Sequence, residues 1–144
     1  MNTDTLVMKA AGFAKKAHGG QKSGDGDYYH NHLVQVAHTY SKKFGYDSVG
    51  VAVCYLHDAI EDTCETYESI QYIFGDNIAD YCNLLTKRSG ESYQSYLAWL
   101  SDTKSCARVK WADSYVNLQK CIETEQWCRG QKYLKNLDYL KDYI

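Results

Sequence analysis

The chain has 144 residues and a formal net charge of −2, with 44% hydrophobic and 24% charged residues. This balance is typical of a folded protein with one core, and it excludes a disordered chain. The near-neutral charge, without any long basic run, argues against a nucleic-acid partner. Proline is absent, so long helices can form throughout, and we expect a compact all-α fold with a single domain over residues 1–144.

The N-terminal residues lack the basic start and apolar run of a signal peptide. No apolar stretch approaches the ~20 residues that are needed to span a bilayer, so no membrane partner is expected. The six cysteines, at positions 54, 64, 82, 106, 121 and 128, form no Cys-x-x-Cys pair and fall within helical patterns. They therefore indicate buried thiols rather than disulfides or a zinc site and, without an export signal, a cytoplasmic setting.

Apolar spacing predicts a first helix over about residues 4–18, capped by Thr3 or Asp4. Residues 19–27 are rich in glycine and polar side chains, which predicts a loop. A second helix is expected over about residues 30–44, because the glycine that follows would stop it. The first 44 residues are thus predicted to be two helices and a connecting loop.

A third helix is expected over residues 49–61, with Asp47 or Ser48 as its cap. Its valine-rich first part could be a buried strand if taken alone. The polar residues after it recur at spacings of three and four, which favours a helix. Later helices are predicted from Thr66 to Gly75, from Asp76 to Leu85, from between Ser89 and Glu91 to Leu100, from Thr103 to about Glu123, and from Gln131 to Tyr143, the last with Tyr133, Leu134, Leu137 and Leu140 facing inward.

Three carboxylates and one imidazole gather at the end of the third predicted helix. His57 and Glu61 are four residues apart, as are Asp58 and Asp62, so all four fall within an arc of roughly 140°. Like charges this close raise one another's pKa values unless a cation lies among them. Imidazole with carboxylates suits divalent manganese, iron or zinc. The alternative is a solvated acidic helix end.

Two other segments carry side chains of the same kind. Asp113 and Asn117 lie one turn apart beside an apolar helix face, where a carboxylate needs a cation and an amide needs a hydrogen-bonding partner. The cation could instead be Lys110, three residues earlier on the same helix. His30 and His32 enter a second amphipathic helix, where a histidine either points at a site or fills the core.

Together these segments resemble the hydrolase domain of RelA/SpoT-type enzymes, including the stand-alone small alarmone hydrolases, within the HD superfamily. The resemblance runs in order from residue 11 to residue 118, which makes it specific, and it implies a helical HD-domain fold. Five stretches carry it: residues 11–21, which match the family's opening pattern; 26–37, which match "G-x-x-Y-x-x-H-P-x-x-V-A" with Leu33 in place of the proline; 56–63, which reproduce "L-H-D-x-x-E-D-T"; 74–79, which match "F-G-x-x-I-A"; and 109–118, which contain "K-x-A-D-x-x-x-N-L".

The resemblance implies a role for each matching position. The metal ligands would be His32, which precedes the family's proline position and is therefore chosen over His30, with His57, Asp58 and Asp113. Glu61 and Asp62 would be the catalytic acids that hold and activate the attacking water, and Asn117 would contact the substrate.

The implied activity is metal-dependent hydrolysis of guanosine 3′,5′-bis(diphosphate) at its 3′ position, which releases pyrophosphate. A bound metal lowers the pKa of water towards ~7 and polarises the phosphoryl oxygen. A carboxylate then transfers the proton. Mn²⁺ is the expected ion, with Fe²⁺ or Zn²⁺ as alternatives. A small-molecule nucleotide is the expected partner, and a homo-oligomer is left open.

Departures from the family pattern affect recognition of the base. Ser23 or Gly24 stands where relatives carry an arginine that packs on guanine, and lysine cannot reproduce that flat surface. Ser114 and Lys120 also differ from the pattern. The substrate could therefore be the adenine analogue ppApp or NADPH. The expected phosphate contacts at this end are Lys22, Ser23 and Lys110, with Lys87 and Arg88 as further candidates.

Two other functions stay open at this point. One is a nucleotide sensor that keeps the pocket without catalysis, although such proteins usually lose a metal ligand or a catalytic acid and this sequence retains all of them. The other is an HD phosphatase that acts on deoxynucleoside monophosphates. The Glu-Asp pair and the stretch over residues 26–37 argue against this second alternative.

Overall fold

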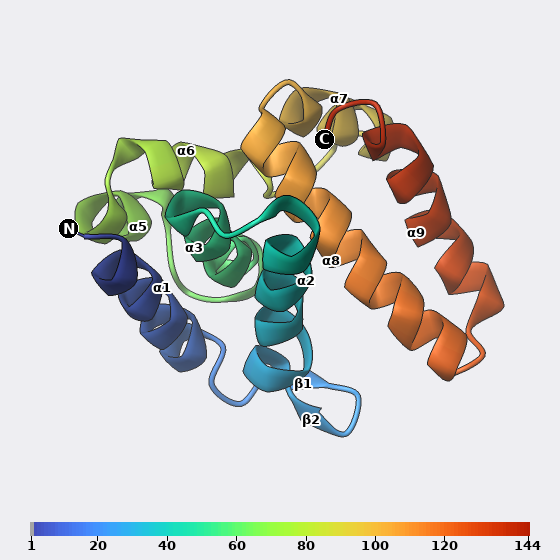
Figure 1. Ribbon diagram of the computed structural model, residues 1–144, viewed down its shortest axis with the longest axis horizontal. Coiled ribbons are helices and arrows are strands. Elements are labelled where there is room, and N and C mark those ends of the chain that lie inside the picture. The colour runs from blue at the N-terminus through green and yellow to red at the C-terminus, as the bar shows by residue number, and fades with distance from the viewer. Residues whose placement is uncertain (1) are drawn as a thin grey trace.

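The computed structural model describes residues 2–144, and it confirms the predicted all-α fold. Helices follow one another along the chain, interrupted by one short hairpin (Figure 1). The helices are α1 (Thr3–Ala17), the π-helix η1 (Tyr29–Leu33), α2 (Val34–Phe44), α3 (Ser48–Leu56), α4 (Ala59–Asp62), α5 (Tyr67–Phe74), α6 (Asp76–Leu84), α7 (Tyr93–Ser101), α8 (Lys104–Glu123) and α9 (Trp127–Leu140), and the strands are β1 (Lys22–Ser23) and β2 (Gly26–Asp27).

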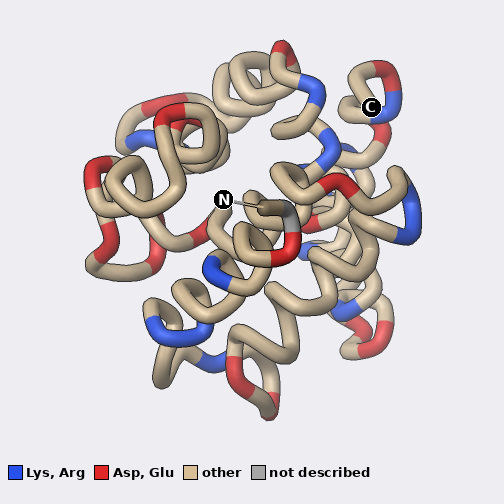
Figure 2. Tube along the Cα trace, turned by 60° about the vertical axis from the view of Figure 1, so that its left-hand side comes forward, with Lys and Arg blue, Asp and Glu red and all other residues tan. Residues whose placement is uncertain are grey.

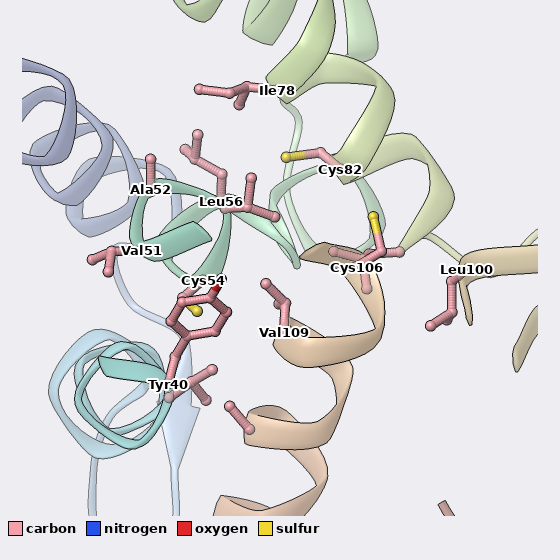
Figure 3. Close-up of a cluster of buried hydrophobic side chains, with 14 of the residues drawn as sticks. Tyr40, Val51, Ala52, Cys54, Leu56, Ile78, Cys82, Leu100, Cys106 and Val109 are labelled. Carbon is pink, nitrogen blue, oxygen red and sulfur yellow. The ribbon is translucent and has the colours of Figure 1, made fainter. Parts of the chain in front are cut away.

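The apolar helix α3 lies at the centre, and α1, α2, α6 and α8 pack around it. Its valine-rich sequence forms a helix rather than a strand, and six of its nine residues are buried. Figure 3 shows Cys54 and Leu56 of α3 among Tyr40 of α2, Cys82 of α6 and Val109 of α8. This core fixes the end of α3 against the middle of α8, so it determines where both segments present their polar residues.

The surface carries both signs of charge. Lysine and arginine alternate with aspartate and glutamate along the trace, without a continuous stripe of either sign over the described residues (Figure 2). None of the helices in residues 2–144 combines the length and the apolar character that a bilayer crossing needs.

Helix caps explain most of the boundaries. Asn2, rather than Thr3 or Asp4, caps α1, because its side chain accepts a hydrogen bond from the Thr5 amide at 2.8 Å. Asp47 and Thr66 cap α3 and α5 as predicted. The start predicted for α7 is too early: Ser92 caps that helix and accepts from the Ser95 amide at 3.1 Å. The residues before Ser92 form a turn in which Gly90 has a φ of 80°.

The single helix predicted over residues 49–61 is wrong, because the chain breaks it at His57 and Asp58. The Nδ1 atom of His57 lies 2.7 Å from the Cys54 carbonyl oxygen, which in a continuous helix would accept the Asp58 amide. The backbone turns at Asp58, with φ of −102° and ψ of 0°, and then forms α4. His57 and Asp58 therefore lie in a turn, and the carboxylates of α4 follow it.

The glycine-rich segment predicted to be a loop also contains regular structure. Lys22 and Ser23 pair with Gly26 and Asp27 as a two-stranded antiparallel hairpin. The helix after it begins as the π-helix η1, so the second predicted helix is α2 with one wider turn in front. Single π-helical turns such as η1 are frequent at functional sites.

The C-terminal helix α9 begins at Trp127, four residues earlier than predicted. Glu125, with a φ of 57°, makes the turn from α8, and the Gln126 amide donates to the Cys121 carbonyl at 2.8 Å. Such a turn normally carries glycine, so this sequence did not signal it. The predicted inward position of Leu134 is also wrong: this side chain is 54% exposed, whereas Asn136 is buried.

The cysteine prediction holds in part. All six thiols are free, as expected. Cys54, Cys82, Cys106 and Cys121 are buried, but Cys64 and Cys128 are exposed.

We expect Gly50→Ala to destabilise the fold by about 1–3 kcal/mol, since overpacking a filled site forces its neighbours to move. A Cβ atom at Gly50 would overlap the Tyr40 hydroxyl and lie 2.7 Å from an oxygen of Asp47, the residue that caps α3. Urea unfolding would measure the loss. Gly12→Ala is the control: Gly12 lies in α1 with open space around it, so alanine should be neutral or stabilise by up to about 1 kcal/mol. Equal effects at the two positions would contradict this account of α3.

Candidate metal centre and substrate cavity

Three separate parts of the chain bring four ligand-type side chains together. His32 comes from η1, His57 and Asp58 from the turn after α3, and Asp113 from the middle of α8. One ligand atom from each lies within 4.8 Å of the others. His32 Nε2 is 2.8 Å from Asp113 Oδ1, and His57 Nε2 is 3.1 Å from Asp58 Oδ2. The grouping matches the four metal ligands expected from the sequence.

The imidazole of His57 provides a test of whether a metal fits here. Its Nδ1 faces the Cys54 carbonyl and so carries a proton, which leaves Nε2 to face the carboxylates of Asp58 and Asp113, the latter at 3.4 Å. Nε2 is buried and has no hydrogen-bond partner among the described residues. A neutral imidazole would turn its lone pair on two carboxylates, so the arrangement needs a positive charge there, either a proton on Nε2 or a bound cation. A divalent cation with nitrogen and oxygen ligands fits that requirement.

Both carboxylates are held by further side chains. Asp58 Oδ2 accepts a hydrogen bond from the Tyr28 hydroxyl. Asp113 Oδ2 pairs with Lys110 at 3.2 Å, while its Oδ1 faces the two histidines. Such partners orient metal ligands and set their basicity. Lys110, expected to contact phosphate, thus also makes the alternative ion pair with Asp113.

The protonation equilibria follow from this crowding. Burial lowers the pKa of His57, but Asp58 and Asp113 outweigh it and hold that pKa well above its ordinary value. Burial raises the pKa of Asp58, yet His57 brings it down to about 2. The pKa of Asp113 is also well below its usual range: burial opposes this, and Lys110 and the two histidines cause it. Both aspartates are therefore ionised at neutral pH, as metal ligands must be.

His30 and His32, the two candidate ligands of this segment, have different surroundings. His30 is exposed and pairs with Asp27 at 2.9 Å. His32 is 3% exposed and points at Asp113. This geometry agrees with the choice of His32 as the ligand.

Glu61 and Asp62 lie on α4, directly after two of the proposed ligands. Burial and the nearby Asp58 raise the pKa of each carboxyl above its ordinary value. Glu61 Oε1 accepts from the Lys87 amide at 3.2 Å, and Asp62 Oδ2 accepts from the Gln21 side chain at 3.4 Å. Carboxyls with raised pKa values beside a metal site are suited to proton transfer near neutral pH.

A cavity of about 890 Å³ opens in front of these residues, a size that accommodates a nucleotide. Nine of the ten residues predicted for the site line it, and His57 is buried behind them. The nine are His32, Asp58, Glu61, Asp62, Asp113, Asn117, Lys22, Ser23 and Lys110. Asn117 also donates to Asp113 Oδ1 at 3.3 Å, so it contacts a proposed ligand.

The far wall of the cavity comes from α9, which the sequence analysis did not connect with the site. Arg129, Lys132 and Tyr133 line this wall. Arg129 and Lys132 of this wall, together with Lys120, are cations that the sequence had not placed at the site. No spacing rule links α9 to the earlier motifs, because its approach depends on the tight turn at Glu125.

Lys120 connects α8 to the hairpin. Its ammonium donates to Ser23 Oγ at 3.1 Å and to the Asn31 carbonyl oxygen. Asn31 in turn donates to the Ser23 carbonyl at 3.0 Å. The residue that departs from the family pattern therefore fixes the hairpin wall of the cavity.

Fold and site together define a helical domain with a candidate divalent-metal site among the described residues. The HD domain family model matches residues 10–103, about two thirds of the chain. The chain belongs to the HD domain family, as predicted. A solved structure of a metazoan SpoT orthologue that hydrolyses ppGpp superposes with a TM-score of 0.78 at 19% identity, over 96% of this chain and 86% of that one. That likeness confirms the helical HD fold.

Relatives in sequence belong to the RelA/SpoT type, which confirms the predicted resemblance. The GTP pyrophosphokinase rsh of Brucella ovis is 31% identical over 127 residues, which cover 81% of this chain. The guanosine-3′,5′-bis(diphosphate) 3′-pyrophosphohydrolase of Aquifex aeolicus is 36% identical over 89 residues, or 62% of this chain. This chain spans 17% of the Brucella protein and 13% of the Aquifex protein.

Proposed function

We propose that this protein is a metal-dependent nucleotide phosphohydrolase that removes the 3′-pyrophosphate of guanosine 3′,5′-bis(diphosphate). The observation that carries the proposal is the cluster of four ligand atoms within 4.8 Å, with Glu61 and Asp62 beside it on the cavity wall. The Aquifex relative, named for this activity, supports the choice of reaction and base.

His32, His57, Asp58 and Asp113 would hold the divalent ion, for which Mn²⁺ is our first choice. When bound, such an ion polarises the phosphoryl oxygen and makes water more acidic. Glu61 and Asp62 would hold the attacking water, accept its proton and return a proton to the departing ribose oxygen. The P–O bond to the ribose 3′ oxygen breaks, water adds to phosphorus, and pyrophosphate is released.

The cations of the cavity would bind the remaining phosphates. Lys110 lies beside the proposed metal ligands, and Arg129 and Lys132 face it from α9. Burial and the neighbouring Lys110 and Arg129 lower the pKa of Lys132, while Asp113 and Glu61 oppose this shift. We assign Lys22 and Ser23, on the hairpin, and Asn117, on α8, to substrate contacts on the other side.

The direct test is incubation of the purified protein with ppGpp and Mn²⁺, followed by detection of pyrophosphate. Parallel reactions with ppApp and NADPH would define the base and the phosphate position. Absence of turnover on all three would refute the proposal. Tight nucleotide binding by calorimetry without cleavage would identify a sensor instead.

We expect Lys120→Met to raise KM about 10-fold with little change in kcat, since a hydrogen bond to a charged group contributes about 1.5–3 kcal/mol. The variant frees Ser23 and Asn31, so the hairpin wall loosens while the metal centre stays intact. Steady-state kinetics measure the effect. Lys42→Met, at an exposed position of α2, is the matched control, and a KM that changes equally in both variants would contradict the role of Lys120.

A further inference from the structure

His18 is a buried histidine that lies outside the proposed metal centre. His18 ends α1 and is 3% exposed. Its Nδ1 lies 2.7 Å from Gln21 Oε1, and its buried Nε2 has no partner among the described residues. Because an amide oxygen can only accept, Nδ1 carries the proton and donates it to Gln21.

The backbone around Gln21 is fixed on both sides. The Gln21 amide donates to the His18 carbonyl at 3.0 Å, and the Gln21 carbonyl accepts from the Tyr28 amide at 2.9 Å. With its Oε1 held by His18, the side-chain amide must turn its Nε2 the other way. Nε2 faces Asp62 Oδ2 at 3.4 Å, the long end of the hydrogen-bond range.

The ring of His18 is held in turn by the residues of the site. It packs against Tyr28 with ring centroids 5.0 Å apart and planes inclined by 34°. Tyr28 packs in the same way on His32, at 4.9 Å, and donates to Asp58. A rotation of His18 would therefore disturb this packing.

Asp62 depends on this arrangement because it is otherwise free. Gln21 is the one side chain that hydrogen-bonds its carboxylate in residues 2–144. Glu61, in contrast, is held by a backbone amide, that of Lys87. Asp62 is also exposed, so without Gln21 its carboxylate would sample several rotamers.

We propose that His18 is a positioning residue: through the amide of Gln21 it orients the Asp62 carboxylate towards the reacting water. The inference rests on the proposed function, in which Asp62 handles a proton. His18 itself touches neither the substrate nor the four ligand atoms. It fixes which end of the Gln21 amide faces the site.

The test compares two substitutions at one position. His18→Leu removes the donor and should lower kcat on the order of 10- to 100-fold, as expected for a misplaced catalytic group, with KM and metal affinity within about twofold. His18→Asn places an amide N–H near the position of Nδ1 and should retain most of kcat. His38→Leu, at an exposed position of α2, is the control and should have wild-type kcat. Equal kcat losses in the leucine and asparagine variants at position 18 would overturn the proposal.

A double-mutant cycle identifies the route. Gln21→Leu should lower kcat as much as His18→Leu, and the double variant should lose no more than either. Additive losses would overturn the route through Gln21. A crystal structure of His18→Leu gives a readout independent of turnover: the Gln21 amide should leave Asp62, and an unchanged contact would refute the inference. If the wild type releases no pyrophosphate while that contact breaks as expected, the proposed function fails and the positioning contact stands.

Discussion

Asp58→Ala is expected to abolish both metal binding and phosphohydrolase activity. Asp58 Oδ2 lies 3.1 Å from His57 Nε2 and 3.9 Å from His32 Nε2, so alanine removes the carboxylate between both imidazoles. Loss of an outer partner of a metal ligand already costs about 10–100-fold in affinity, and loss of a ligand should exceed that range. Calorimetric titration with Mn²⁺ and a pyrophosphate-release assay would measure the two losses.

Asp138→Ala is the matched control for this substitution. Asp138 lies on the exposed side of α9, where it pairs with Lys141 at 2.8 Å, so its loss should leave metal affinity and turnover unchanged. Metal binding that survives in the Asp58 variant would show that the centre lies elsewhere. Circular dichroism of both variants separates loss of a ligand from loss of the fold.

Glu61→Gln and Asp62→Asn should each leave metal binding intact and lower kcat by about 10²–10⁴-fold, the range for loss of general acid–base catalysis. The amides keep the shape of the carboxyls but cannot accept and return a proton. Burial and Asp58 raise the pKa of both carboxyls, which suits them to that task. Single-turnover kinetics at saturating metal would isolate the chemical step.

Glu68→Gln, in the first turn of α5, tests whether any charge change on the surface has the same effect. We expect wild-type kcat for this variant. The assignment of Glu61 and Asp62 would be wrong if their variants kept full turnover, or if they lost metal in step with activity. Loss of metal in step with activity would mean that Glu61 and Asp62 are metal ligands, whereas full turnover would mean that they take no part in the reaction.

The sequence predicted which four side chains would gather better than it predicted the helix that carries two of them. His57 and Asp58 were placed on a continuous helix, yet they lie in a turn, because the His57 side chain takes the Cys54 carbonyl. The spacing of apolar residues does not reveal that the His57 side chain will compete with a backbone amide for this carbonyl oxygen. The grouping of His32, His57, Asp58 and Asp113 was still predicted, since it rested on motif order along the chain rather than on helical geometry.

The cavity wall was the part that sequence patterns could not supply. Arg129 and Lys132 are ordinary surface residues by composition, and their place beside the site follows from a turn at Glu125 that has no glycine to signal it. The prediction that Leu134 faces inward failed because contacts with other helices, rather than the pattern of α9 alone, decide which residues are buried. Asn136 is buried there because its side chain donates to Ser114 and Tyr93, at 3.2 and 2.9 Å, a pairing between helices that single-helix periodicity does not contain.

The placement of α9 has a consequence for how such proteins diverge. None of the four proposed metal ligands and neither of the proposed catalytic acids lies on α9, which begins at Trp127. The wall could therefore differ between relatives without a change in the residues that we propose to bind the metal and transfer protons. We expect a chimera that carries α9 of a relative to take on that relative's preference among nucleotides and to keep the proposed hydrolytic reaction.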